Sequence, residues 1–173
     1  MVRYRLGFLV ALIVFVLDQL AKWVVTHPLG INEIGDQLVL LPIFNFTYTR
    51  NEGISLGLLN ATNPVGRWML VGLTTAIAVG VAVWIGRERN RIDQIALGMV
   101  LGGALGNIID RLLYSRVTDF ILWHVHNHEW PVFNVADAAL VVGVIGLLFD
   151  LREEKPEAEA EKASDESASK RRR

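Results

Sequence analysis

The chain of 173 residues contains no cysteine, which excludes a disulfide scaffold, a cysteine nucleophile and a thiolate metal site. Charge is scarce in residues 1–151, which hold 21 of the 35 charged side chains; a typical domain is charged at about one residue in four. The net charge of -1 gives no reason to expect a nucleic-acid partner. Because 52% of the residues are hydrophobic, the composition indicates a membrane protein rather than a soluble domain.

Four apolar stretches are each long enough to cross a bilayer, which takes about 20 helical residues. The chain is therefore expected to be an all-α polytopic membrane protein with one membrane domain over residues 1–151. Its final segment, 152–173, carries seven basic and seven acidic residues without an apolar period, and is expected to be a disordered tail. The four predicted spans are residues 6–26, 66–86, 92–113 and 132–151.

The first span could instead be a cleaved signal peptide, since Arg3 and Arg5 precede its apolar run. No small-x-small cleavage site follows, and the helical pattern continues through Trp23. We therefore expect an uncleaved span.

Basic residues predict the orientation of the spans, because cytoplasmic loops carry an excess of Lys and Arg. They cluster before the first span, between the second and third, and after the fourth, whereas segments 27–64 and 114–131 each contain a single arginine. Four spans would place every cluster on one side. Both termini are therefore expected in the cytoplasm, with the two sparse segments outside.

The first outer segment has the pattern of a small sheet rather than of a plain loop. Turn residues lead into the apolar run 38–41, and residues 44–50 alternate strictly, with Phe44, Phe46 and Tyr48 on one face. We expect a small extracytoplasmic antiparallel sheet between the first two helices, lying on the outer leaflet. The alternative is an amphipathic loop without a paired strand.

Two aspartates near the outer membrane boundary are candidates for chemistry, because ionisable residues at membrane depth are costly and usually functional. Asp119 lies among apolar residues of the second outer segment, and Asp137 lies in the first turns of the fourth span, three residues after Asn134. Two neighbouring carboxylates in a low dielectric share a proton and can act as general acid and general base in hydrolysis. Paired carboxylates in spans also serve proton or ion transport, in which Asp110 could take part, so a transporter is the first alternative. A scaffold protein whose polar residues only join helices is the second.

Other polar residues in the spans favour structural roles. Asp18 and Lys22 are four residues apart on one helical face and can neutralise each other. Asn107, Asp110 and Arg111 also share a face and are expected to join helices by hydrogen bonds. The nearby small residues Gly102, Gly103 and Gly106 would let another helix approach closely.

The sequence also offers two weaker catalytic patterns. His124, His126 and His128 with Glu129 resemble a metal cluster, but we place them in a loop near two interfacial tryptophans and expect no metal. Ser55 and Ser115, the serines outside the tail, lack the sequence context of a nucleophile.

Taken in order, five motifs resemble those of the lipoprotein signal peptidase family, also called signal peptidase II. The resemblance covers about residues 6–151 and leaves out the tail. The motifs are Asp18-Gln19-x-x-Lys22, Asn51-x-Gly53, Gly102-Gly103-Ala104-x-Gly106-Asn107-x-x-Asp110-Arg111, Val117-x-Asp119-Phe120 and Phe133-Asn134-x-Ala136-Asp137.

The resemblance implies a four-span aspartyl endopeptidase of the bacterial inner membrane that needs no cofactor or metal. Its implied substrates are prolipoproteins carrying a diacylglyceryl-modified cysteine, cut just before that cysteine, and its other contacts are membrane lipids. We expect a monomer with its site near the outer face. By motif, Asp119 and Asp137 carry over as the catalytic dyad. The remaining motif residues carry over as substrate-binding or site-organising residues (Asn51, Gly53, Asn107, Arg111 and Asn134) and as structural support (Asp18, Lys22 and Asp110).

The sequence departs from the family pattern after Gly53. The family commonly has a small alanine and then phenylalanine there, where this chain has Ile54 and Leu56. Both positions stay apolar, so the fold is not in doubt, but contacts to lipid or inhibitor are expected to differ.

Overall fold

The computed structural model describes residues 5–53, 64–126 and 128–149. Three of its helices are long and apolar enough to cross a membrane: α1 (Arg5–Thr26), α2 (Pro64–Arg87) and α3 (Arg91–Tyr114). A shorter apolar helix follows at Val135–Phe149. Helices thus form where the first three spans were predicted. The predicted tail and the departures at Ile54 and Leu56 lie outside the described residues.

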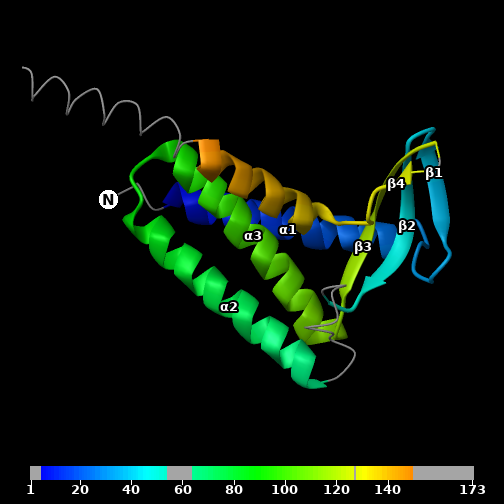
Figure 1. Ribbon diagram of the computed structural model, residues 1–173, viewed down its shortest axis with the longest axis horizontal. Helices are drawn as coiled ribbons and strands as arrows, with labels where there is room; N and C mark the ends of the chain where they lie inside the picture. Colours follow the sequence, from blue (N-terminus) through cyan, green and yellow to red (C-terminus); the bar gives the residue numbers. More distant parts are fainter. Residues whose placement is uncertain (1–4, 54–63, 127, 150–173) are drawn as a thin grey trace, which may run out of the picture.

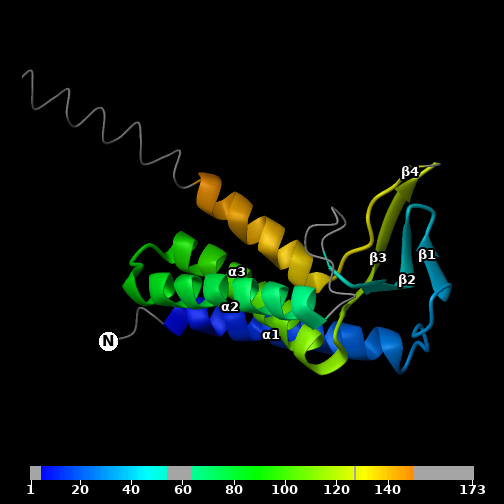
Figure 2. The same ribbon diagram turned by 60° about the horizontal axis from the view of Figure 1, so that its bottom comes forward.

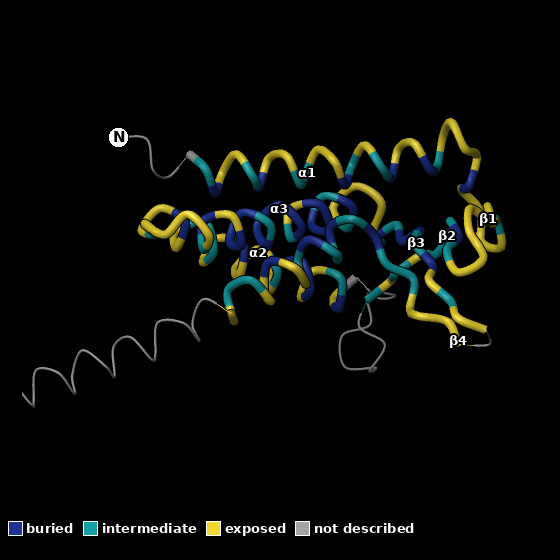
Figure 3. Tube along the Cα trace, turned by 90° about the horizontal axis from the view of Figure 1, so that it is seen from above, coloured by how far each residue is buried: buried dark blue, intermediate teal, exposed yellow. Residues whose placement is uncertain are grey.

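The helix α3 lies at the centre of the bundle and packs against both α1 and α2. Figure 3 shows buried residues concentrated along α3, while α1 and α2 are exposed along their outer faces. Leu97 and Leu101 of α3 form the helical core with Ala11 and Ile85. The apolar outer faces suit a lipid environment, because lipid solvates them without a penalty.

Close helix contacts depend on glycines of α3, as the small-residue pattern predicted. A Cβ added at Gly102 would lie 2.5 Å from the carbonyl oxygen of Ala11 in α1, and one at Gly103 would meet the carbonyl oxygen of Ala136. A Cβ at Gly106 would lie 2.5 Å from Asp18 Oδ2. Adjacent faces of α3 therefore hold α1 and the Val135–Phe149 helix against it, and Gly106 lies close to both.

A four-stranded antiparallel sheet in the order β1-β2-β3-β4 lies at one end of the helices. Figures 1 and 2 show it beside the last turns of α1 and α3, opposite the turn that joins α2 to α3. A second core cluster fixes it to α1 through Val25, Ile31, Tyr48 and Phe120. Its strands are β1 (Gln37–Leu41), β2 (Phe44–Asn51), β3 (Val117–Val125) and β4 (His128–Glu129).

The sheet differs from the sequence prediction in which segments contribute its strands. The strands expected in the first outer segment exist, and Phe44, Phe46 and Tyr48 do belong to one strand. However, the sheet is not confined to the segment between the first two helices, because β3 and β4 come from the second outer segment and β3 pairs with β2. The prediction missed β3 because its run of apolar residues does not alternate with polar ones.

The fourth helix also begins later in the chain than the sequence predicted. Residues 132 and 133 were expected to be helical, but the helix begins at Val135. Phe133 instead pairs with Ile121 of β3, through an N–H···O bond of 3.1 Å in one direction and 2.8 Å in the other. The backbone of Phe133 is therefore committed to the sheet, and Asn134 becomes the N-cap of the helix.

Candidate active site

Asp119 is fixed at the inner face of β3. Its neighbour across the sheet is Thr49 of β2, and the alternation of the strand turns the carboxylate inward, where it is only 1% exposed. Oδ2 accepts a 2.9 Å hydrogen bond from Asn51 Nδ2, and Oδ1 accepts one of 2.6 Å from Asn134 Nδ2. Each oxygen of the carboxyl group thus has an amide partner.

The position of Asn51 depends on the turn that follows β2. The backbone N–H of Gly53 donates to Asn51 Oδ1 at 3.1 Å, which leaves Asn51 Nδ2 for Asp119. Gly53 has φ +135°, a backbone conformation that strongly favours glycine. The motif Asn51-x-Gly53 is therefore one unit that aims an amide at the carboxyl group.

Asp137 lies at the third position of the Val135–Phe149 helix and completes a reciprocal cap with Asn134. The backbone N–H of Asp137 donates to Asn134 Oδ1 at 2.9 Å, and the backbone N–H of Asn134 faces Asp137 Oδ2 at 3.3 Å. This is the capping-box geometry that fixes the first turn of a helix. Asp137 therefore has a structural role at the start of the helix, and this role fixes where its carboxylate points.

Two asparagine side chains connect the carboxyl groups. Asn107 of α3 donates from Nδ2 to Asp137 Oδ1 at 2.8 Å, and its Oδ1 lies 3.2 Å from Asn134 Nδ2. Asn134 in turn donates to Asp119. The chain Asp119–Asn134–Asn107–Asp137 therefore brings β3, α3 and the last helix to one site. Asp119 and Asn134 are buried, while Asp137 is half-buried.

The surroundings of Asp119 favour its protonated form. Burial, and next the negative charge of Asp137, raise the pKa of Asp119 to about 7, although the hydrogen bonds from Asn51 and Asn134 oppose this rise. At neutral pH a proton is therefore available on Asp119. A protonated and an ionised carboxyl group side by side can act as general acid and general base.

Arg111 is the cation of the site. Its guanidinium interacts electrostatically with Asp137, Asp119 and Asp110, and its Nη1 lies 3.4 Å from the carbonyl oxygen of Asn107. Its Nε is buried and has no partner among the described residues. The sequence prediction that Asn107, Asp110 and Arg111 join helices is confirmed for two of them, because Asn107 bonds Asp137 and Asp110 bonds Gln19 and Lys22 of α1. The contact of Arg111 with Asn107 stays within α3.

A second network supports the site from α1. Lys22 Nζ lies 2.7 Å from Asp18 Oδ2 and 2.8 Å from Asp110 Oδ2, and all three residues are buried. Asp18 Oδ1 also accepts a 2.9 Å hydrogen bond from the backbone N–H of Ala136, one residue before Asp137. The predicted Asp18–Lys22 pair is thus confirmed, and it extends across three helices to the helix start that carries Asp137.

Sequence reasoning missed Gln19 as part of this network. Its Nε2 lies 3.0 Å from Asp110 Oδ1 and 3.1 Å from Asp18 Oδ2. The signal was available, since Gln19 is a polar residue between Asp18 and Lys22 in an otherwise apolar span. An amide at membrane depth usually has a buried partner.

The histidine cluster is placed differently from the sequence prediction. The three histidines do not lie in one loop: His124 is in β3, His126 is in the turn with φ +55°, and His128 is in β4. His124 Nε2 contacts Asn45 Nδ2 at 3.1 Å. Within residues 5–53, 64–126 and 128–149, no three His, Asp or Glu side chains come together as metal ligands.

Comparisons with known proteins agree with this arrangement. The family model described as signal peptidase (SPase) II matches residues 10–152. A lipoprotein signal peptidase of Sphingopyxis alaskensis is 43% identical over 145 residues, which cover 83% of each chain. Another, from Rhizorhabdus wittichii, is 44% identical over 158 residues, covering 89% of this chain and 91% of the relative.

A solved structure leads to the same class of protein. A bacterial membrane enzyme, determined by the in meso method at 2.3 Å resolution, superposes with a TM-score of 0.75 and 30% sequence identity, covering 86% of this chain and 88% of the other. Together with the apolar helices, these matches make the chain a bacterial inner-membrane protein. Because the family model covers most of its length, the chain belongs to the lipoprotein signal peptidase (signal peptidase II) family and is a protease.

Proposed function

We propose that Asp119 and Asp137 are the catalytic dyad of an aspartyl endopeptidase that removes signal peptides from prolipoproteins. The observation that carries this proposal is the amide chain through Asn134 and Asn107, which positions one buried and one half-buried carboxyl group at a single site. Structural ion pairs do not need such an arrangement. Two carboxyl groups with different environments are what a shared-proton mechanism requires.

In the proposed reaction, ionised Asp137 takes a proton from water while the water oxygen attacks the scissile carbonyl carbon. The carbonyl oxygen takes the proton of Asp119, which gives a tetrahedral diol. Asp137 then passes its proton to the amide nitrogen, Asp119 regains one from a diol hydroxyl, and the carbon–nitrogen bond breaks. The exposure of Asp137 suits the water-activating role, and the raised pKa of Asp119 suits the acid role.

The remaining site residues position the substrate in this proposal. Asn51 and Asn134 keep the carboxyl group of Asp119 oriented through their amides. Arg111 is half-buried, and the exposed part of its guanidinium can donate to a substrate carbonyl. Asp18, Lys22 and Asp110 act as support for the start of the catalytic helix.

The proposed substrate carries a diacylglyceryl group on the cysteine just after the cleaved bond, so it is held in the bilayer. A site at the lipid boundary suits such a substrate. The outer ends of α1 and α3 lie beside the sheet, and exposed apolar residues of the first hairpin, such as Val39, Leu41 and Ile43, suit contact with the outer leaflet.

The proposed topology has four spans, with the Val135–Phe149 helix as part of the fourth. Arg87, Arg89 and Arg91 lie at the end of the bundle away from the sheet. Under the positive-inside rule, that end is cytoplasmic together with both termini. The dyad then lies near the outer face, and a monomer contains every residue of the site.

The direct test incubates the purified protein with a lipid-modified prolipoprotein and follows release of the signal peptide. Asp119→Asn and Asp137→Asn should each reduce turnover by at least about a hundredfold, the usual contribution of general acid–base catalysis. Both variants should keep their thermal unfolding transition, since asparagine preserves the shape of the side chain. Turnover near that of the wild type in either variant would refute the dyad.

A further inference from the structure

A cavity lies between the end of α1 and strand β3, next to the carboxyl pair but outside it. It has a volume of about 460 Å³, is partly open, and is lined by the last turns of α1 and α3 and by strands β2 and β3. Aromatic side chains from three of these elements line it: Trp23, Tyr48 and Tyr114. None of the residues in the amide chain that links Asp119 to Asp137 is part of its wall.

Strand β3 separates this cavity from the active site. Thr118 lines the cavity, and Asp119, the next residue, is turned toward Asn51 and Asn134. Successive side chains of a strand point to opposite faces. The cavity is therefore behind the catalytic strand, and a peptide bound at the carboxyl pair would not fill it.

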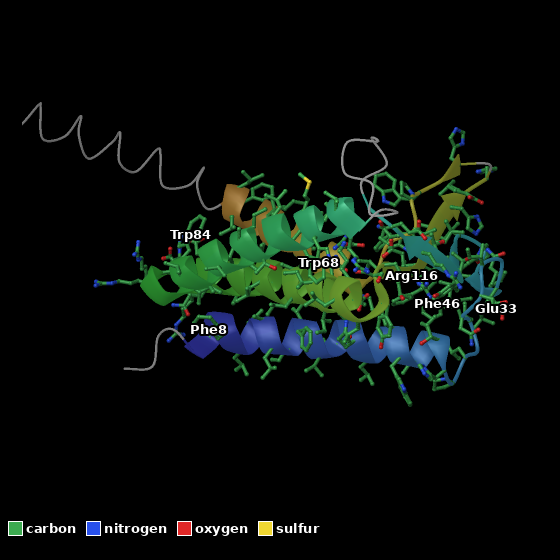
Figure 4. All side chains as sticks on the ribbon, turned by 90° about the horizontal axis from the view of Figure 1, so that it is seen from below. Phe8, Glu33, Phe46, Trp68, Trp84 and Arg116 are labelled. Atoms are coloured by element: carbon green, nitrogen blue, oxygen red, sulfur yellow. The ribbon has the colours of Figure 1, made fainter. Side chains whose placement is uncertain are left out.

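Among the described residues, the cavity wall holds one arginine without an ion-pair partner, beside a cluster of Lys22, Asp18 and Asp110 whose formal charge is negative. Lys22 and Asp110 both line it but form an ion pair of 2.8 Å with each other, and Lys22 is also paired with Asp18. Arg116 lines it as well and has no ion pair among the described residues. Figure 4 places Arg116 where the helix ends meet the sheet. The cavity thus offers a guanidinium, whose planar fork of donors matches a phosphate.

The position of the cavity indicates where such a phosphate would come from. Helix α1 ends at Thr26 and α3 at Tyr114, so the cavity lies at the depth where the spans leave the hydrocarbon region. Trp23 is 53% exposed and Tyr114 58% exposed, which is typical of aromatic residues at headgroup level. A ligand there would have an anionic group beside Arg116 and an apolar part along these rings.

We propose that this cavity binds the headgroup phosphate of a membrane phospholipid, with Arg116 as the phosphate-binding residue and Trp23 and Tyr114 against the glycerol and upper acyl chains. The site is distinct from the one that holds the prolipoprotein. Its occupant contacts Lys22 and Asp110, which belong to the network that supports the catalytic helix.

The test measures lipid binding to the full-length protein by native mass spectrometry in a maltoside detergent. The probes are dimyristoyl phosphatidylglycerol, dimyristoylglycerol, which has the same chains without phosphate, and inorganic phosphate. Phosphatidylglycerol should bind saturably at one site, at least about tenfold more tightly than dimyristoylglycerol. Equal affinity for the two lipids would overturn the phosphate assignment.

Variants localise the site. Arg116→Gln should weaken phosphatidylglycerol binding at least about tenfold, and Arg116→Lys, which keeps the charge but loses the planar fork, should give an intermediate loss. Arg89→Gln is the control, because Arg89 is an exposed cation that neither lines the cavity nor belongs to an element lining it, and it should change binding less than twofold. If Arg116→Gln fails to fold, Arg116→Lys alone decides: unchanged binding refutes the role of the fork.

Three other outcomes contradict the proposal. An equal loss in Arg89→Gln would mean general attraction of anionic lipid to basic residues. Displacement of the lipid by equimolar inorganic phosphate would mean a site for the free anion. Loss of binding in Asp137→Asn would mean that the lipid occupies the carboxyl pair, whereas normal binding in that inactive variant supports a separate site.

Discussion

Asn134 donates a 2.6 Å hydrogen bond from its side-chain Nδ2 to Asp119 Oδ1 and, through its Oδ1, caps the helix that carries Asp137. One side chain therefore has two separable tasks, to hold the buried carboxyl group and to start a helix. Each task uses a different atom of the amide. A substitution that keeps one task and removes the other can tell them apart.

Asn134→Ala should lose both tasks. We expect the free energy of unfolding to fall by about 1 kcal/mol from the lost cap, with an additional loss from the unpartnered carboxyl group, and turnover to fall at least about tenfold. Asn134→Ser retains a capping oxygen but is too short to reach Asp119. It should therefore recover most of the stability and little of the turnover. Thermal unfolding and cleavage rates on the same preparations check this, and recovery of both together would contradict the division of tasks.

The pH dependence of cleavage should have an upper limb near pH 7. Burial and the charge of Asp137 raise the pKa of Asp119 to about 7, so the acid is protonated below that pH and ionised above it. We expect kcat/KM to fall about tenfold per pH unit above the limb, because the proton donor is then lost. The measurement is a pH series with one lipidated substrate, and a rate that rises steadily to pH 9 would contradict the acid role of Asp119.

The upper limb of the pH profile of cleavage should shift when Asn51 is replaced. Its hydrogen bond to Asp119 favours the ionised form and lowers the pKa, so Asn51→Ala should shift the upper limb to higher pH while reducing the maximal rate. Thr47→Ala, in the same strand, removes a contact to the carbonyl oxygen of Asp36 instead and should leave the limb in place. A shift to lower pH in Asn51→Ala would show that the amide favours the protonated form.

The sequence carried enough information to predict the helices and the pairing partners within a span. The first three 20-residue apolar stretches and the spacing of Asp18 and Lys22 are local patterns, and both appear in the structure as predicted. The glycines of α3 were predictable for the same reason, since a small residue marks a close helix contact wherever its partner lies.

Features that depend on distant pairing were not predictable. Residues 120–123 of β3 are continuously apolar and show no alternation, so the pairing of this strand with β2 has no signature in its own residues. The capping box at Asn134 and Asp137 was not predicted, because the apolar side chain of Phe133 placed this residue inside the predicted span. In the structure the backbone of Phe133 pairs with Ile121 instead, and the helix starts after Asn134. The link from Asp18 to the backbone of Ala136 joins residues 118 apart in the chain, and only the packed helices reveal it.

The network around Lys22 should be essential for stability. Lys22→Met leaves the carboxylates of Asp18 and Asp110 buried without their cation, and breaking a buried ion pair from one side costs about 3–5 kcal/mol. We expect a marked fall in the thermal unfolding temperature in detergent. Lys22→Met with Asp110→Asn should be less destabilised than the sum of the two single changes, because the pair is removed together. The control is Arg89→Gln, an exposed cation at the opposite end, which should change stability by less than about 0.5 kcal/mol.

The orientation in the membrane should follow the arginines of the turn between α2 and α3. Arg87, Arg89 and Arg91 lie at the end of the bundle opposite the sheet, and short loops rich in arginine remain in the cytoplasm. A reporter fused after Arg89 should therefore read as cytoplasmic, and one fused near Asn60 as outside. Because the dyad lies at the sheet end, these two readings also place the active site near the outer face. An outside reading after Arg89 would invert the bundle and put Asp119 and Asp137 on the cytoplasmic side, where the proposed substrate's cleavage site would not reach them.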